Sequence, residues 1–62
     1  MTKEQETALR EVHERWEIET DFDTFKATAR PLLGGGGCLM VHVGSPSNPM
    51  WLGIETDGYT HS

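Results

Sequence analysis

The stretch Gly34-Gly35-Gly36-Gly37 divides this 62-residue chain into two halves of unlike composition. The residues before the four glycines are rich in charge and typical of helices, whereas those after them are apolar, β-branched or turn-forming and include no Lys or Arg. Gly34 has the conformational freedom to end a helix in the left-handed region. We therefore expect a helical half, a flexible glycine elbow at residues 34–37, and a β half.

The first half predicts a helix near residues 3–18. Thr2 and Gln5 have the spacing of a capping box, in which each side chain satisfies a backbone amide of the other residue. Apolar residues at the spacing i, i+3, i+7 form one narrow stripe on this helix, which we expect to face the core. The stripe consists of Leu9, Val12 and Trp16.

A second helix is predicted over about residues 21–30. Thr20 or Asp21 can cap its start, and Pro31 disfavours helical geometry at the residue before it. Its apolar positions are Phe22, Phe25 and Ala29. The short gap between the two helices predicts an antiparallel or crossed pair.

The second half predicts a β-hairpin over about residues 38–55. Two apolar runs, residues 38–43 and 50–54, flank a segment dense in turn formers. Closing the hairpin symmetrically about Pro46 and Ser47 makes three cross-strand pairs, which are Val43 with Met50, Val41 with Leu52, and Leu39 with Ile54. These side chains point to one side of the ribbon, and we expect the two helices to cover that side.

The opposite side of the predicted hairpin lacks an obvious cover. It carries Cys38, Met40, His42, Trp51, Gly53 and Glu55. An isolated two-stranded ribbon is barely stable in water, and its outer edges leave backbone groups unpaired. The ribbon is therefore predicted either to pair with its copy in a second chain or to dock on another protein. The candidate partner-binding residues are Met40, His42, Trp51 and Glu55.

A further alternative is that the C-terminal tail, residues 56–62, folds back over this side. Asp57-Gly58 is a favoured turn sequence and would start such a return. The predicted fold class is α+β. Two N-terminal helices pack on one face of a C-terminal β-hairpin in the order α-α-β-β, within one small domain, and dimerisation is one route by which the sheet would be extended.

Composition narrows the function classes. The net charge is −5, and all five basic residues lie in residues 1–30 beside eight acidic ones. A nucleic-acid binder normally shows a basic patch, so binding to nucleic acid or to an anionic membrane is disfavoured. The N-terminal residues lack the apolar run of a secretory signal, and no membrane-spanning stretch is present. We expect a soluble cytoplasmic protein.

Chemical sites are weakly indicated. Cys38, His42 and His61, with His13 as a further donor, are the residue types that bind zinc, and a metal would support a small core. However, Cys38 and His42 are four residues apart in a strand, which separates them by about 13 Å. Asp57, His61 and Ser62 lie close in sequence, but chain ends rarely hold a catalytic group rigidly. We expect neither an enzyme nor a bound cofactor.

The last part of the chain resembles a known group of proteins. Residues 50–62, Met-Trp-Leu-Gly-Ile-Glu-Thr-Asp-Gly-Tyr-Thr-His-Ser, look like the ends of short, uncharacterised accessory proteins of tailed phages, over about a fifth of the chain. The resemblance implies a small accessory protein that binds and inhibits a host factor in the host cell cytoplasm. It brings no catalytic residues.

Three functions are carried forward. The leading hypothesis is a non-enzymatic accessory protein that acts by protein–protein interaction, with a homodimer as one form of it. One alternative is an oligomer that sequesters a small nucleotide-like ligand, with Trp51 stacking on a base. The other is a small zinc-stabilised module.

Overall fold

The first helix begins where its capping box predicts. In a computed structural model that describes residues 1–62, α1 spans Lys3–Arg15. The Thr2 hydroxyl accepts the amide of Gln5 at 3.0 Å, and the Gln5 side-chain oxygen accepts the amide of Thr2 at 2.8 Å. Acidic residues in the first turn suit the positive end of the helix dipole. The predicted start of this helix is therefore confirmed.

The helix ends at Arg15 rather than at the predicted residue 18. Glu17 adopts a left-handed backbone conformation, with φ of 50°. The amides of Glu17 and Ile18 then bond back to the carbonyls of Glu14 and His13, each at 3.1 Å. This is the Schellman arrangement, which satisfies carbonyls that the helix end leaves free. The predicted end of the helix at residue 18 was therefore wrong. Glutamate is not a residue type that signals a left-handed helix end in the sequence.

The second helix is also shorter than predicted. α2 spans Phe22–Ala27, and Asp21 caps it by accepting the amide of Thr24 at 3.3 Å. The sequence placed residues 28–30 in this helix, but Arg30 instead begins a strand. Pro31 favours extended geometry at Arg30, as the sequence indicated, but the helix already ends at Ala27, three residues earlier.

The β half is a four-stranded antiparallel sheet with strand order β1-β2-β3-β4. Its two central strands form the predicted hairpin, with Leu39 opposite Ile54 and Val41 opposite Leu52, as the sequence indicated. The two outer strands have only two residues each and come from the same chain. The bounds are β1 Arg30–Pro31, β2 Leu39–His42, β3 Trp51–Ile54 and β4 Thr60–His61.

Two predictions about the sheet therefore need correction. The element order is α-α-β-β-β-β, and the extra strands are supplied within the chain rather than only by dimerisation. The glycine run is not an elbow between the two halves. It lies in the loop that joins β1 to β2, where Gly34, Gly36 and Gly37 all have positive φ. The Leu32 amide bonds the Cys38 carbonyl at 2.9 Å and closes this loop.

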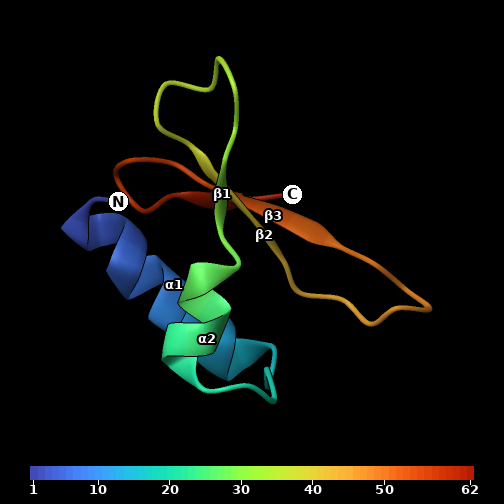
Figure 1. Ribbon diagram of the computed structural model, residues 1–62. Helices are drawn as coiled ribbons and strands as arrows, with labels where there is room; N and C mark the ends of the chain where they lie inside the picture. The colour runs from blue at the N-terminus through green and yellow to red at the C-terminus, as the bar shows by residue number, and fades with distance from the viewer.

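Both helices lie on one face of the sheet, so the molecule has two layers (Figure 1). The core between the layers joins residues of both helices to the inward face of β2 and β3. Its members are Ala8, Leu9, Val12, Phe25, Val41, Val43, Leu52 and Ile54. Trp16, which the sequence placed in the core stripe, is 38% exposed beyond the end of α1.

Gln5 is a buried polar residue that ties the two layers together. Only 1% of it is exposed, and its side-chain nitrogen donates to the carbonyls of Gly37 and Ile54 at 2.8 and 3.1 Å. The capping residue of α1 thus also satisfies two carbonyls of the β half. Neither helix has the length and apolar character that crossing a membrane requires.

Candidate functional site

The sheet face that points away from the helices carries an exposed aromatic pair. Successive side chains of a strand point to opposite faces, so the residues between the core positions of β2 and β3 lie outward. His42 stands opposite Trp51, and their rings meet edge to face with centroids 5.2 Å apart. Trp51 is 51% exposed. A large aromatic side chain at the surface is therefore held in place by its cross-strand neighbour.

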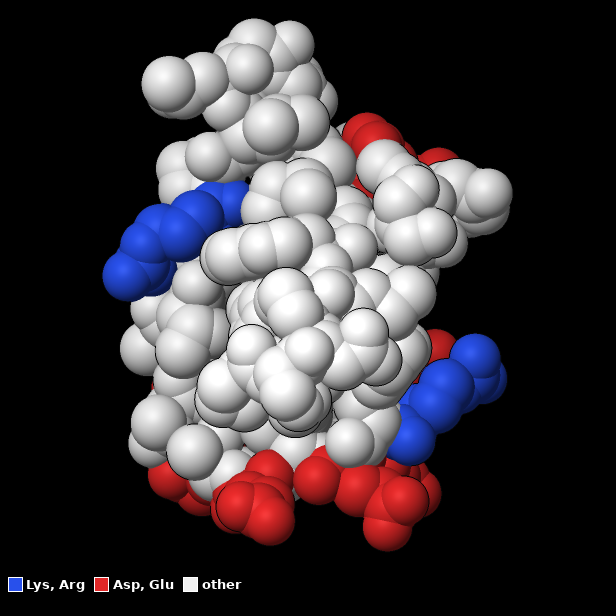
Figure 2. Space-filling view, turned by 90° about the vertical axis from the view of Figure 1, so that its right-hand side faces the viewer, with Lys and Arg blue, Asp and Glu red and all other residues white.

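The segment of the chain that contains Trp51 has no charged residue. No Asp, Glu, Lys or Arg occurs between Arg30 and Glu55, a segment that includes β2, β3 and the turn that joins them. Figure 2 shows the side of the molecule toward which this turn extends, and its middle is free of charged residues. Basic and acidic side chains lie at the margins of that view. Met50, which the sequence placed opposite Val43 on the side covered by the helices, is 37% exposed and does not belong to the core, so that prediction was wrong.

The four predicted partner-binding residues fall into two groups. His42 and Trp51 form the aromatic pair, and Met40 lies next along β2, half-buried opposite Gly53 and Arg30. Glu55 does not belong with them. It lies beyond the other end of β3, and its Oε2 accepts a hydrogen bond from Nε2 of His61 in β4 at 2.7 Å. We therefore define the contact face as Met40, His42 and Trp51.

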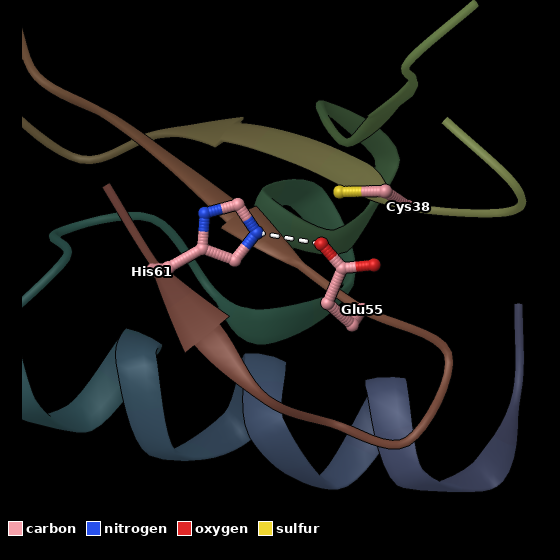
Figure 3. Close-up of side chains that lie close together, drawn as sticks. All are labelled: Cys38, Glu55 and His61. Carbon is pink, nitrogen blue, oxygen red and sulfur yellow. Dashed lines mark hydrogen bonds and ion pairs between the residues drawn. The ribbon is translucent and has the colours of Figure 1, made fainter. Parts of the chain in front are cut away.

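The second group is a cluster of three side chains with metal-binding chemistry. Cys38 precedes β2 and is 2% exposed, Glu55 follows β3, and His61 lies in β4. The thiol sulfur, a carboxylate oxygen and an imidazole nitrogen all lie within 4.8 Å of one another. Figure 3 shows the three side chains converging, with the Glu55–His61 interaction drawn as a dashed line.

Gly53 makes room for this cluster. A Cβ atom at this position would lie 2.7 Å from Cε1 and 2.9 Å from Nε2 of His61, and 3.4 Å from the sulfur of Cys38. Real Cβ atoms essentially never approach another atom as closely as 2.7 Å. The absence of a side chain at Gly53 is therefore what lets His61 lie over the centre of the sheet beside Cys38.

The electrostatics of the cluster bear on its chemistry. Burial raises the pKa of the Cys38 thiol, and the neighbouring Glu55 carboxylate raises it further. A cysteine nucleophile needs the opposite, a lowered pKa supplied by positive charge or a helix N-terminus. In this metal-free arrangement the thiol stays protonated at neutral pH. The cluster is therefore not arranged to activate Cys38 as a nucleophile.

The structure brings together two of the three residues that the sequence suggested for zinc. Cys38 and His61 are adjacent, but His42 packs against Trp51 instead. His13 is further removed from such a role, because its Nε2 bonds the carbonyl of Thr20 at 2.6 Å in the helical layer. Glu55 is the donor that the sequence reasoning missed, although a return strand after the Asp57-Gly58 turn is the signal that brings it near His61.

The remaining sequence-based alternatives gain little from the geometry. Asp57 accepts the amide of Tyr59 at 2.9 Å, which is a turn-forming role. None of the surface hollows of the molecule is lined by Trp51, so there is no pocket in which a base would stack on it.

No protein-family model, curated protein or solved structure matches this chain.

Proposed function

We propose that this chain is a non-enzymatic protein-interaction module whose contact face binds a second polypeptide. The observation that supports this proposal is the half-exposed Trp51, which packs against His42 on the outward face of the sheet, in a segment without charged residues. Tryptophan and methionine are enriched in the cores of interfaces, and charged residues are depleted there. The resemblance of residues 50–62 to accessory proteins of tailed phages agrees with a binding role.

The energy available at Trp51 is large for a single residue. A tryptophan side chain buries up to about 250 Å². Covering the exposed half of it at about 25 cal/mol per Å² contributes roughly 3 kcal/mol. That value matches the size of an interface hot spot. We therefore expect Trp51 to dominate the contact, with Met40 and His42 as its neighbours on the same face.

The partner that the surface favours is a second copy of the same chain. An isologous contact needs a patch that complements itself, and an uncharged apolar patch meets that need without any pairing of charges. The acidic residues lie mainly in the helical half, on the other layer of the molecule, so their repulsion across such a contact is weak. A 62-residue domain also gains stability from association more than a larger one does.

A stable contact must bury a sizeable share of the surface of this small chain. An interface of standard size buries about 800 Å² on each partner. The whole chain exposes 4356 Å², so such an interface covers somewhat less than a fifth of its surface. Trp51 alone cannot supply this area. The interface must extend along β2 and β3 and onto the turn between them.

The test is the solution mass of the purified chain, measured by light scattering across a concentration series. We expect the mass to rise from one chain to two with concentration, and Trp51→Ala to weaken that association by roughly 10⁴-fold, because each of the two Trp51 side chains in the dimer contributes about 3 kcal/mol. Leu33→Ala is the matched control, since Leu33 is 95% exposed in the loop between β1 and β2 and lies outside the contact face. A mass of one chain at every concentration would contradict the proposed partner. Equal association by both variants would contradict the proposed face.

A further inference from the structure

We propose that Cys38, Glu55 and His61 bind one Zn²⁺ ion through the thiolate, a carboxylate oxygen and an imidazole nitrogen, with water as the fourth ligand. This inference concerns the side chains around Gly53, two residues along β3 from Trp51, and does not rest on the proposed contact face. It is carried by the convergence of the three donors within 4.8 Å of one another.

The donor set selects the metal. A thiolate and an imidazole are soft and borderline ligands that suit zinc, whereas magnesium and calcium require sites built from oxygen. Zinc sites with three protein ligands and one water are well known in proteins. One cysteine, one histidine and one glutamate therefore form a plausible zinc set, in which the two exposed donors face solvent and the buried sulfur faces the sheet.

The distances allow a metal after a small rearrangement. Zinc bonds of about 2.0–2.3 Å in a tetrahedron separate neighbouring ligand atoms by roughly 3.3–3.7 Å. The donors of Glu55 and His61 are now 2.7 Å apart, so they must separate by somewhat less than 1 Å to admit the ion. Both side chains are only half-buried, at 42% and 38% exposure, and can rotate without disturbing the core.

The surroundings hold the donors in place. The His61 ring lies over Gly53, where no Cβ exists to displace it, and stacks on Tyr59 with ring centroids 5.8 Å apart. Cys38 is fixed at the start of β2 by the loop that the glycines close. An exposed Glu–His ion pair alone adds little stability. A metal ion bound by all three residues explains why this ion pair lies against Cys38, the only cysteine of the chain.

A metal here would fasten the C-terminal strand to the rest of the sheet. β4 has only two residues, and its ladder joins Gly53 to His61 and Ile54 to Thr60. Cys38 is distant from Glu55 in the sequence, and a turn separates Glu55 from His61. A metal bound by all three residues would therefore link three segments of the chain. Because a ligand that binds only the folded state stabilises it, zinc is expected to raise the melting temperature.

The first experiment uses the full chain, treated with a chelator and then titrated with zinc chloride. Native mass spectrometry is expected to show one zinc ion per chain. Titration with Co²⁺ is expected to produce the ultraviolet charge-transfer absorption of a thiolate–cobalt bond, which reports on Cys38 directly in the unmodified protein. Absence of a bound ion, or cobalt binding without the thiolate band, would overturn the proposal.

Variants then identify the remaining donors. Glu55→Gln and His61→Gln are each expected to weaken zinc binding by more than about 100-fold, which exceeds the usual effect of an outer-shell residue. His42→Gln is the matched control and should leave zinc affinity unchanged, since His42 lies with Trp51. Affinity retained in His61→Gln, or lost in His42→Gln, would refute the assigned ligands. The circular dichroism of each variant shows whether it is folded, and the cobalt spectrum of the unmodified chain remains decisive if one is not.

Discussion

Replacing Gln5 by Leu should destabilise the fold far more than its position on a surface helix suggests. Gln5 is 1% exposed and makes three side-chain hydrogen bonds, one with the amide of Thr2 and two with the carbonyls of Gly37 and Ile54. Leucine has a similar volume and a high helix propensity, so the change leaves packing and helix formation nearly intact. It removes the hydrogen bonds and leaves their backbone partners unsatisfied.

The magnitude follows from these three bonds. Each contributes about 1 kcal/mol, so the expected loss is about 3 kcal/mol. A chain of 62 residues has a total stability of roughly 3–9 kcal/mol. Gln5→Leu should therefore lower the melting temperature by roughly 12–24 °C, or leave the chain partly unfolded at room temperature.

The assay is urea and thermal unfolding followed by far-ultraviolet circular dichroism, at a concentration below that of self-association. Thr7→Ala is the control on the same helix, because Thr7 is exposed and should change stability by less than about 0.5 kcal/mol. A Gln5→Leu variant as stable as the parent would show that the carbonyls of Gly37 and Ile54 find other partners. The argument that Gln5 joins the two layers would then be wrong.

Three further perturbations test other parts of the structure. Glu17→Gly should stabilise the chain by about 1 kcal/mol in thermal unfolding, because Glu17 has φ of 50° and glycine adopts that geometry without strain; a destabilised variant would contradict the Schellman end of α1. The hydrogen bond and charge of Lys26 lower the pKa of Glu6 below its ordinary value of 4.5, so its stabilising contribution is present above that pH and lost as the pH falls through the folded-state pKa. Glu6→Gln should therefore flatten the acid side of the stability–pH curve measured by urea unfolding, and an unchanged curve would mean that the ion pair is not formed in solution. Gly53→Ala should displace His61 and undock β4, seen as loss of amide protection at residues 60–61 in hydrogen exchange, whereas retained protection would contradict the close packing over Gly53.

The sequence predicted the centre of the sheet better than its edges. The alternation of apolar side chains fixed the pairing of Val41 with Leu52, since a slip of one residue would turn the whole apolar set outward. A strand of two residues, such as Arg30–Pro31 or Thr60–His61, has no periodicity to detect. Their existence depends on the loops that return the chain to the sheet, and those loops are set by tertiary packing.

The residues of the two candidate sites could also be predicted only in part from the sequence. Alternation alone placed His42 and Trp51 on the outward face, and the structure has them there. The argument that Cys38 and His42 lie too far apart along a strand to share a metal was sound. However, it considered the residues of one strand only. Glu55 joins Cys38 and His61 because β4 returns beside β3, a contact between neighbouring strands that spacing along the chain does not reveal.

The most direct test of the contact face uses Trp51 as its own reporter. In a Trp16→Phe chain, the fluorescence of the one remaining tryptophan is measured together with its quenching by acrylamide over a dilution series. We expect blue-shifted, poorly quenched emission at high concentration that becomes red-shifted and readily quenched on dilution, as the partner leaves Trp51. Emission that stays red-shifted and fully quenchable at every concentration would contradict the claim that a second chain covers this face.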